Sequence, residues 1–318
     1  MPTGAKRMKR RLLRGLARIW STVSGVLAVA ILKTVRLVNP DPMTNFAGWF
    51  MRKVGPLLPE HRIGRANLVG AFPEKSPAEI EAILAGVWDN LGRVGAEFAN
   101  LDRIWDFDPY NPKSGRIHLD DTAVARFMQL AGDGKPALIF SAHLANWELP
   151  AICAATYRLD TAILYRRPNV AGIDKWLRQT RAANMGELVP TGLEAPMKLA
   201  NALDRGVHVG MLVDQYYVRG VPVTFFGRRT KANPLLARLA QHFDCPIHGV
   251  RMIRLPGNRF TAEISEAIVP AREADGTIDI AGTTQIITGV IEGWIREHPE
   301  QWLWLHRRWR PEDEQPPR

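Results

Sequence analysis

His143 and Glu148 are the two residues of this sequence whose types and spacing point most directly to chemistry. A neutral imidazole held by a carboxylate can remove a proton from a hydroxyl, and the carboxylate then stabilises the imidazolium that forms. The chain contains no G-x-S-x-G elbow, and Ser141 precedes the histidine within its strand-like run, so no protein nucleophile is evident nearby. The activated hydroxyl is therefore expected to belong to the substrate and to attack a bound thioester. An equally open alternative is a structural histidine at a strand end followed by a glutamate at a helix cap.

The elements expected around these two residues are a buried strand and a helix. Residues 137–140 form a continuous apolar run, which is typical of a central strand. His143 follows the carboxyl end of this strand, where ligand sites of open α/β sheets collect. A helix is predicted from about residue 147 to 157, with Asn146 or a neighbour as its cap and Glu148 in its first turn. From there Glu148 is expected to accept a hydrogen bond from the imidazole.

Helical and strand-like segments alternate from residue 120 onward. The expected strands are residues 116–119, 137–140, 161–165, 188–189, 207–213, 247–255 and 260–266. This alternation predicts an α/β fold with a single mixed, mostly parallel sheet flanked by helices. Residues 43–101 are expected to be helical and to form a layer over the sheet, with Ser76 before Pro77 as a helix start.

The composition limits the classes of protein to which the chain can belong. Its 318 residues allow one large domain or two ordinary ones, and 46% hydrophobic with 23% charged residues exclude a disordered chain and a multi-span membrane protein. The net charge of +10 indicates an anionic partner, which is nucleic acid, acidic lipid or an acidic protein. Cys153 and Cys245 lie far apart and are expected to be reduced thiols.

The amino-terminal residues combine basic and apolar character. Residues 1–18 contain seven Lys and Arg residues, and an apolar run over residues 19–32 follows, short of the roughly 20 residues that a membrane span needs. Residues 1–40 are therefore predicted to hold a membrane-associated helix, lying in the cytoplasmic leaflet or crossing as a tilted single span. The alternative is a basic tail before an ordinary buried helix. Residues 41–310 are predicted to form the main domain, and residues 311–318 a flexible tail.

Three groups of charged and polar residues follow strand-like runs and are expected to meet at the edge of the sheet that carries His143. The groups are Arg166 with Asn169, Asp214 with Gln215, and Arg228 and Arg229 with Lys231. Arginines offer charge-assisted donors to phosphate or carboxylate, and cations beside a helix start favour an anion. Asp214 could orient an arginine or a hydroxyl. The alternative for each group is a solvated turn or a helix cap.

The chain closes with alternating aromatic and apolar residues followed by His306, Arg307 and Arg308. Such a segment suits a membrane interface or a lipid headgroup with acyl chains beside it. The alternative is an ordinary closing strand or helix that buries Trp302 and Trp304.

Over nearly its whole length the sequence resembles the lipid A secondary (late) acyltransferases, the lauroyl or myristoyl acyltransferases, which are related to the glycerolipid acyltransferases. The resemblance rests on the basic and apolar amino terminus and on motifs in a specific order. These motifs are the H-x-x-x-x-E box at 143–148, Tyr-Arg-x-x-Asn at 165–169, Asp-Gln at 214–215, Phe-Phe-Gly at 225–227 and the tryptophan-rich segment 302–309.

This resemblance implies acyl transfer from acyl carrier protein or acyl-CoA to a hydroxyl of a Kdo-bearing lipid A precursor. It also implies a glycerolipid-acyltransferase-like fold and work at the cytoplasmic face of the inner membrane of a Gram-negative bacterium. His143 and Glu148 would be the catalytic dyad, with Arg166 and Asp214 nearby. The expected partners are acyl carrier protein, the lipid A precursor and the inner membrane, with no nucleic acid, no metal and no bound cofactor.

Two other functions remain open at this point. One is a sibling acyltransferase that uses the same dyad on a mannosyl-inositol lipid or a lysophospholipid. The other is a non-catalytic basic protein that binds lipid or nucleic acid, although the chain carries no recognisable nucleic-acid-binding motif.

Overall fold

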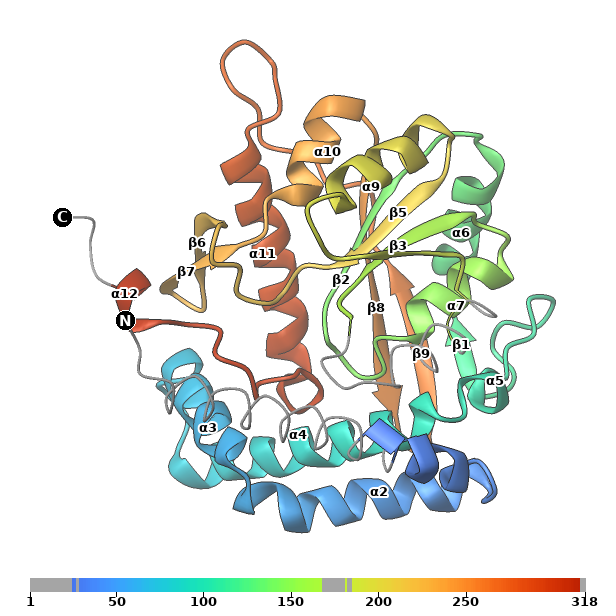
Figure 1. The fold of residues 1–318 in the computed structure, drawn as a ribbon, viewed down its shortest axis with the longest axis vertical. Coiled ribbons are helices and arrows are strands. Elements are labelled where there is room, and N and C mark those ends of the chain that lie inside the picture. Colours follow the sequence, from blue (N-terminus) through green and yellow to red (C-terminus); the bar gives the residue numbers. More distant parts are fainter. Residues whose placement is uncertain (1–24, 27–28, 168–180, 182–184, 315–318) are drawn as a thin grey trace, which may run out of the picture.

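A seven-stranded sheet forms the centre of the protein in the computed structural model, which describes residues 25–26, 29–167, 181 and 185–314 (Figure 1). Its strand order is β1-β9-β8-β2-β5-β3-β4. The strands are β1 (Ile117–Leu119), β2 (Leu138–Ser141), β3 (Thr161–Tyr165), β4 (Glu187–Pro190), β5 (His208–Leu212), β8 (Ile247–Leu255) and β9 (Arg259–Ile264). All neighbouring strands pair in parallel except β8 with β9. The predicted mixed, mostly parallel α/β sheet is therefore confirmed.

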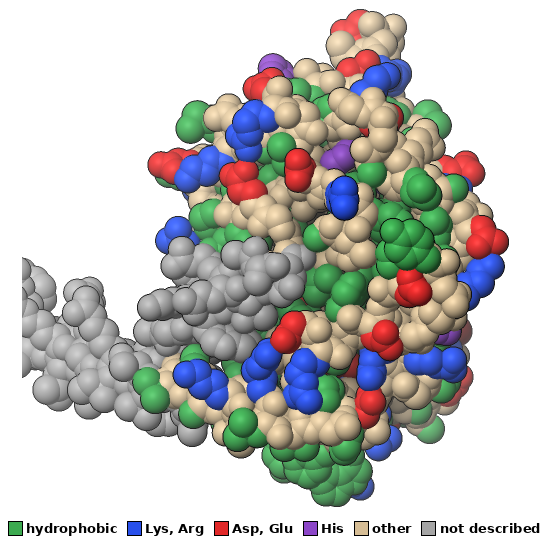
Figure 2. Space-filling model, turned by 90° about the vertical axis from the view of Figure 1, so that its right-hand side faces the viewer, with side chains coloured by type: hydrophobic (Ala, Val, Ile, Leu, Met, Phe, Trp, Pro, Cys, Tyr) green, Lys and Arg blue, Asp and Glu red, His purple; other side chains and the backbone are tan. Residues whose placement is uncertain are grey.

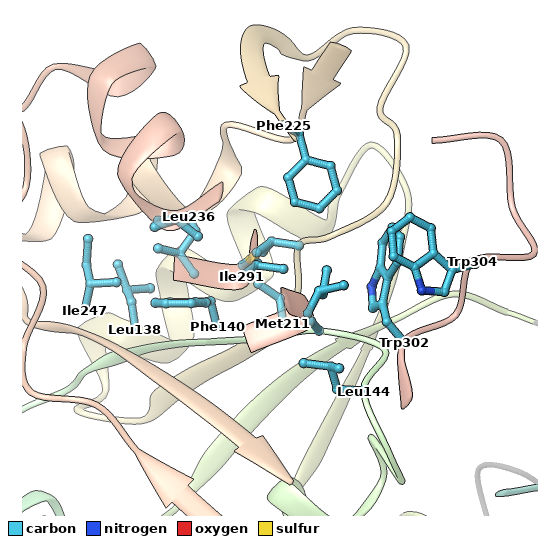
Figure 3. Close-up of a cluster of buried hydrophobic side chains, with 14 of the residues drawn as sticks. Leu138, Phe140, Leu144, Met211, Phe225, Leu236, Ile247, Ile291, Trp302 and Trp304 are labelled. Carbon is cyan, nitrogen blue, oxygen red and sulfur yellow. The ribbon is translucent and has the colours of Figure 1, made fainter. Parts of the chain in front are cut away.

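Helices cover both faces of this sheet because the side chains of its strands β2 and β3 alternate between two apolar clusters. Helices α6 (Asp121–Gly132) and α7 (Leu149–Thr156) pack on one face, and α9 (Ala195–Asp204), α10 (Leu235–Phe243) and α11 (Ile280–Glu297) pack on the other. Figure 3 shows the second cluster, in which Phe140 of β2 and Met211 of β5 lie near Ile291 of α11. Strand β2 is thus buried between two helical layers.

The amino-terminal helices lie across one end of the sheet rather than as a layer over its face (Figure 1). They are α2 (Pro40–Val54), the short η1 (Gly55–Leu57), α3 (Pro59–Ala71) and α4 (Pro77–Phe98), and a single turn α5 (Leu101–Ile104) follows. Arg254, near the end of β8, donates hydrogen bonds to Asn90 and Glu97 of α4. The predicted helix start at Ser76 is confirmed, because Ser76 and Glu79 form a capping box.

Helix α2 presents an exposed aromatic face. Thr44 and Gly48 are buried toward α4, whereas Phe46, Trp49 and Phe50 are 55, 48 and 45% exposed. The ring centre of Phe46 stands 5.9 Å from that of Trp49 and 6.1 Å from that of Phe50. Figure 2 shows hydrophobic side chains gathered along the lower edge of the molecule, the edge that α2 forms in Figure 1. We call these three residues the α2 aromatic face.

The predicted amino-terminal membrane helix receives no support from the structure. No helix within the described residues is long and apolar enough to cross a bilayer. Most of the basic and apolar segment, residues 1–24 and 27–28, lies outside the described residues. At the other end of the chain, residues 311–314 form the short turn α12 (Pro311–Glu314), and its Asp313 pairs with Lys231 at 2.7 Å.

A β-hairpin that was not foreseen connects the sheet to α10. It consists of β6 (Val221–Phe225) and β7 (Arg228–Ala232), paired antiparallel. Phe226 and Gly227 at its turn have φ values of 53° and 68°, the left-handed conformation that tight two-residue hairpin turns require. Glu292 of α11 accepts a hydrogen bond from the backbone N–H of Phe226 at 2.6 Å.

The closing tryptophans are part of the core, so the interpretation of this segment as a membrane interface is wrong. Trp302 and Trp304 are 1 and 0% exposed, and Trp309 is also buried. Indole N–H groups need acceptors when buried, and both tryptophans have one: Trp302 donates to Asp214 and Trp304 to the carbonyl of Pro299, each at 2.7 Å. The segment is neither a regular helix nor a strand, and it pairs with the loop that follows β2, where the N–H of Leu303 donates to the carbonyl of His143 at 3.1 Å.

Candidate active site

His143 lies two residues beyond the end of β2, in a tightly held loop. Ala145 of this loop has a φ of 46° and is completely buried. Its N–H donates to the carbonyl of Gln301 at 2.9 Å, and its carbonyl accepts from Asn90 at 3.1 Å. An unfavourable left-handed residue persists only where its surroundings fix it. Helix α4 and the carboxyl-terminal segment therefore hold the His143 loop in one conformation.

Asp214, and not Glu148, is the carboxylate that holds the imidazole. Nδ1 of His143 lies 2.8 Å from Oδ1 of Asp214, and the His143 backbone N–H donates to Oδ2 at 2.9 Å. Trp302 donates its indole N–H to the same Oδ2 at 2.7 Å. Burial alone would raise the pKa of Asp214, but the attraction of His143 and the two hydrogen bonds from His143 hold it well below its ordinary value.

An ionised Asp214 fixes the tautomer of His143. A carboxylate can only accept hydrogen bonds, so Nδ1 must carry the proton and Nε2 presents its lone pair. Nε2 lies 3.4 Å from the side-chain nitrogen of Gln215, which also lines the cavity described below. Nε2 of His143 is therefore the ring nitrogen on the side of Gln215 and the cavity, which is where a general base would need it.

Glu148 binds an arginine instead of the histidine. Helix α7 begins at Leu149, so Glu148 precedes the first turn, and no hydrogen bond joins it to His143 among the described residues. Its carboxylate makes a two-point ion pair with Arg181, with distances of 2.8 Å to Nε and 2.5 Å to Nη2. The predicted hydrogen bond from the imidazole to Glu148 is therefore wrong. Glu148 was expected in the first helical turn because Asn146 was expected to cap the helix. The Asn146 side chain instead donates to Glu97 and accepts a hydrogen bond from the backbone N–H of Glu148.

The pairing with Arg181 gives a testable expectation for Glu148→Ala. Because this change leaves a largely buried guanidinium unpaired, it should destabilise the fold by roughly 3 kcal/mol. The pH profile of any remaining activity should match that of the wild type, since Asp214 still orients His143. Chemical denaturation and rate measurements over a pH series test both statements, and a displaced pH profile would show that Glu148 acts on the imidazole after all.

An apolar cavity of about 590 Å³ opens beside His143. It lies over the sheet face that α6 and α7 cover, and polar groups gather near His143. Apolar members of its lining include Phe127, Leu130, Leu159, Ile163, Val250 and Ile264. Polar members include His143, Glu148, Arg166, Arg181 and Gln215. This volume is in the range of small-molecule sites, and the arrangement suits an alkyl chain that ends in a polar, reactive group.

The expected groups after the strands are only partly brought together. Arg166 and Gln215 line the cavity, and Asp214 lies directly behind His143. Asn169 lies outside the described residues. Sequence reasoning missed Arg181 because nothing in its helix-like segment distinguishes it from the other arginines. It also missed Trp302 as a donor to Asp214, since contacts between residues so far apart leave no local pattern.

The basic group of the hairpin does not line this cavity. Arg228, Arg229 and Lys231 lie on β7, and Lys231 pairs with Asp313. The guanidinium of Arg228 stands 4.6 Å from the ring centre of Trp309. The expectation that this group meets the others at the His143 edge stays a prediction. The hairpin that carries these residues was not recognised in the sequence, and its turn packs on α11.

The carboxyl-terminal His306, Arg307 and Arg308 also lie outside the cavity lining. Arg307 is exposed, whereas Arg308 is 1% exposed and donates to Oγ1 of Thr230 at 2.7 Å. Burial lowers the pKa of Arg308 to about 10. His306 donates from Nδ1 to the carbonyl of Leu303 at 2.7 Å, and burial lowers its pKa to about 4. Arg308 therefore has a structural role in this conformation, and His306 is neutral at pH 7.

The neutral His306 predicts acid sensitivity. Because its folded pKa is about 4, below the ordinary value of 6.5, the unfolded state binds more protons between these two pH values. Stability should therefore fall as the pH drops from 6.5 toward 4, and His306 should contribute about 2 kcal/mol of that loss by pH 5. Denaturation curves of wild type and His306→Asn at pH 7 and pH 5 measure the difference. An equal acid loss in both proteins would contradict the prediction.

The described residues contain no group of three or more His, Cys, Asp or Glu side chains arranged to hold a metal ion. The expectation that the protein needs no metal stays a prediction. Both cysteines are free thiols, and burial raises the pKa of Cys245 to about 11.

The α/β sheet, the His143–Asp214 pair at the end of its central strand and the adjoining apolar cavity define a site of the type expected in an acyltransferase that acts on lipids. The model of the family described as bacterial lipid A biosynthesis acyltransferase matches residues 8–311, so the chain belongs to that family. A search of curated proteins finds no match. Family membership indicates an acyltransferase of lipid A biosynthesis, in agreement with the resemblance noted in the sequence.

Proposed function

We propose that this protein transfers a fatty acyl chain from acyl carrier protein, or from acyl-CoA, to a hydroxyl of a Kdo-lipid A precursor. The observation that carries the proposal is the basic Nε2 of His143, held by Asp214 and directed into an apolar cavity of about 590 Å³. The family supplies the lipid A context.

In the proposed reaction the acceptor hydroxyl takes the place of Gln215 beside Nε2 of His143. Nε2 removes the hydroxyl proton while the oxygen attacks the thioester carbonyl, and Asp214 stabilises the imidazolium that results. When the tetrahedral intermediate collapses, the C–S bond breaks and the imidazolium returns its proton to the leaving thiolate. The products are the ester and a free thiol, and His143 is again neutral.

The cavity is proposed to receive the acyl chain of the donor. Its apolar lining excludes water from the chain, and each methylene transferred out of water contributes about 0.8 kcal/mol. Arg166, exposed at the rim of this cavity, is proposed to bind an anionic group of the acceptor headgroup. The ion pair of Glu148 with Arg181 then shapes the space between the chain and the headgroup.

The α2 aromatic face supports a proposed location at the cytoplasmic face of the inner membrane. Aromatic rings with exposed cations nearby suit the boundary between lipid headgroups and acyl chains. Lys53 is exposed on the last turn of α2, and Leu57, 81% exposed, follows it. Helix α4 braces the His143 loop and also carries α2, so a membrane bound at α2 would lie near the site. The amino-terminal residues 1–40 are proposed to add a further attachment.

Replacing Phe46, Trp49 and Phe50 together with serine should weaken binding to vesicles of anionic phospholipid at least about tenfold, because three rings lose their burial in the interface. Vesicle sedimentation measures the effect. Tyr110→Ser is the matched control, since Tyr110 is an aromatic residue, 97% exposed, on a different surface segment. Equal binding by the triple variant and the wild type would refute a membrane contact at α2.

Mass spectrometry of lipids from a strain that lacks the protein tests the proposed acceptor. Lipid A from this strain should lack one acyl chain. Expression of the wild-type protein should restore that acyl chain, and expression of the His143→Ala variant should not. Unchanged lipid A together with a missing acyl chain on a mannosyl-inositol lipid or a lysophospholipid would replace the proposed acceptor by that lipid. Unchanged lipids of every class would leave only a binding role.

A further inference from the structure

Three neighbouring strands present one residue each to the cavity in a straight row. The register pairs Gly210 of β5 with Ile139 of β2 on one side and with Ile163 of β3 on the other. All three are partly exposed, whereas Leu138, Phe140, Val209, Met211 and Ala162, which flank them along the strands, are buried. Central strands of a sheet covered on both faces are normally buried throughout, so the row marks where the cavity touches the sheet.

Gly210 stands in the middle of this row with space above it. Among the residues that the structure describes, a Cβ atom built on Gly210 would have one neighbour within 4 Å, Cγ1 of Ile163 at 3.8 Å. Gly249 of β8 is different, because a Cβ atom there would lie 2.6 Å from Phe140 and 2.8 Å from Trp294. Packing therefore explains the glycine at 249 but not the one at 210. Glycine inside a strand weakens it and often marks the close approach of a ligand.

The space above Gly210 lies at a distance from the reacting atoms. Gly210 is level with Ile139, four residues before His143, which corresponds to at most about 13 Å along the strand direction. An acyl chain whose carbonyl is beside His143 would reach Gly210 with its middle or distal carbons. These carbons have no polar groups, and Ile139 and Ile163 border the same space with apolar side chains.

We propose that the missing side chain of Gly210 sets the length of the acyl chain that the enzyme accepts. The proposal rests on the proposed function, in which the cavity holds the acyl chain of the donor. A larger residue at position 210 would fill part of the cavity that the chain occupies, and long chains would lose contacts that short chains never make. Gly210 is thus a specificity residue and takes no part in proton transfer.

The test uses purified full-length enzyme and a homologous series of saturated acyl donors that compete in one reaction. Gly210→Ala should move the preferred donor toward shorter chains, and Gly210→Leu should move it further. Each methylene that loses its place should lower the relative kcat/KM of long donors about fourfold, so the leucine variant should change the ratio of long to short donors at least about tenfold.

Two further variants separate an effect on the cavity from a general disturbance. Gly289→Leu changes an exposed glycine of α11, where an added Cβ atom would meet no described residue within 4 Å, and should leave the donor ratio unchanged. Ile163→Ala removes the side chain that borders Gly210. As a single change it should shift the preference toward longer donors, and combined with Gly210→Leu it should restore activity with long donors. If the leucine variant does not fold, the alanine variant, whose added methyl group meets only an ordinary contact, decides the question.

The outcomes distinguish this proposal from the proposed function. An unchanged donor ratio in active Gly210→Ala and Gly210→Leu enzymes would overturn the role of Gly210 and leave acyl transfer intact. Wild-type enzyme that transfers no acyl chain from any donor would overturn the proposed function itself.

Discussion

His143→Ala is expected to lower the rate of acyl transfer at least about 100-fold while the protein remains folded. The imidazole is the group whose Nε2 lone pair faces the cavity, so its removal leaves the acceptor hydroxyl without a base. His143 is partly exposed, and Asp214 keeps the hydrogen bonds from the backbone N–H of residue 143 and from Trp302 when the ring is removed. Initial rates with saturating donor and acceptor measure the effect, and circular dichroism checks the fold.

The matched control for this variant is His118→Ala. His118 is a histidine at the far edge of the sheet on β1, where its ring contacts the carbonyl of Gly115 at 3.1 Å. It has no place in the proposed reaction, so its loss should leave the rate unchanged within about twofold, as expected for a surface change. A His143→Ala enzyme with near-wild-type turnover would exclude His143 as the base.

Asp214→Asn is expected to lower kcat by roughly 100- to 10,000-fold with a small effect on KM. An amide of the same shape removes the negative charge that stabilises the imidazolium. Asp214 accepts from three donors: the ring Nδ1 of His143, its backbone N–H and the indole N–H of Trp302. The NH₂ group of an asparagine would face at least one of these donors and could not accept its hydrogen bond. The imidazole would then favour the tautomer whose Nε2 carries the proton and cannot act as a base.

Two comparisons make this prediction specific. Trp302→Phe removes one donor to Asp214 but leaves its charge, so the loss of kcat should be much smaller than in Asp214→Asn. Glu148→Gln should retain the wild-type pH profile because Glu148 holds Arg181. If Asp214→Asn were nearly fully active and Glu148→Gln inactive at every pH, the assignment of the orienting carboxylate would be reversed.

Local patterns were sufficient to predict most of the sheet. The apolar runs at residues 161–165 and 247–255 became strands with the predicted bounds, and the apolar run before His143 became β2 with its ends shifted by one residue. The hairpin of β6 and β7 was missed because Pro222 and the charged residues of β7 do not resemble a buried strand. It is a two-stranded sheet that packs on α11, and its strands depend on that packing.

The candidate site was predicted by position but not by pairing. The sequence places His143 after the central strand and Asp214 after another, and the parallel pairing of β2 with β5 brings these two strand ends together. The spacing of five residues from His143 to Glu148 favoured a local contact instead. Helix α7 starts later than expected, and the Glu148 side chain meets Arg181, so the choice between two carboxylates depended on a contact between distant residues.

The tryptophan-rich carboxyl-terminal segment shows the same limit. Aromatic residues alternating with apolar ones suit a lipid interface and a protein core equally well. Burial of Trp302 against the His143–Asp214 pair shows that this segment belongs to the core. Three exposed aromatic residues lie instead on α2, within the segment 43–101 that the sequence predicted to be helical.

A single-turnover reaction tests most directly whether a substrate hydroxyl attacks the thioester without an acyl-enzyme intermediate. The purified protein is mixed with Kdo-lipid A precursor and with acyl carrier protein that bears a labelled acyl chain. Mass spectrometry follows the acyl chain on the carrier, the lipid and the intact protein. We predict that the lipid gains one acyl chain as the carrier loses it, with no acyl group on the protein at any time. An acyl-protein adduct that forms and is then consumed, or a lipid that stays unacylated beside folded protein, would contradict the account.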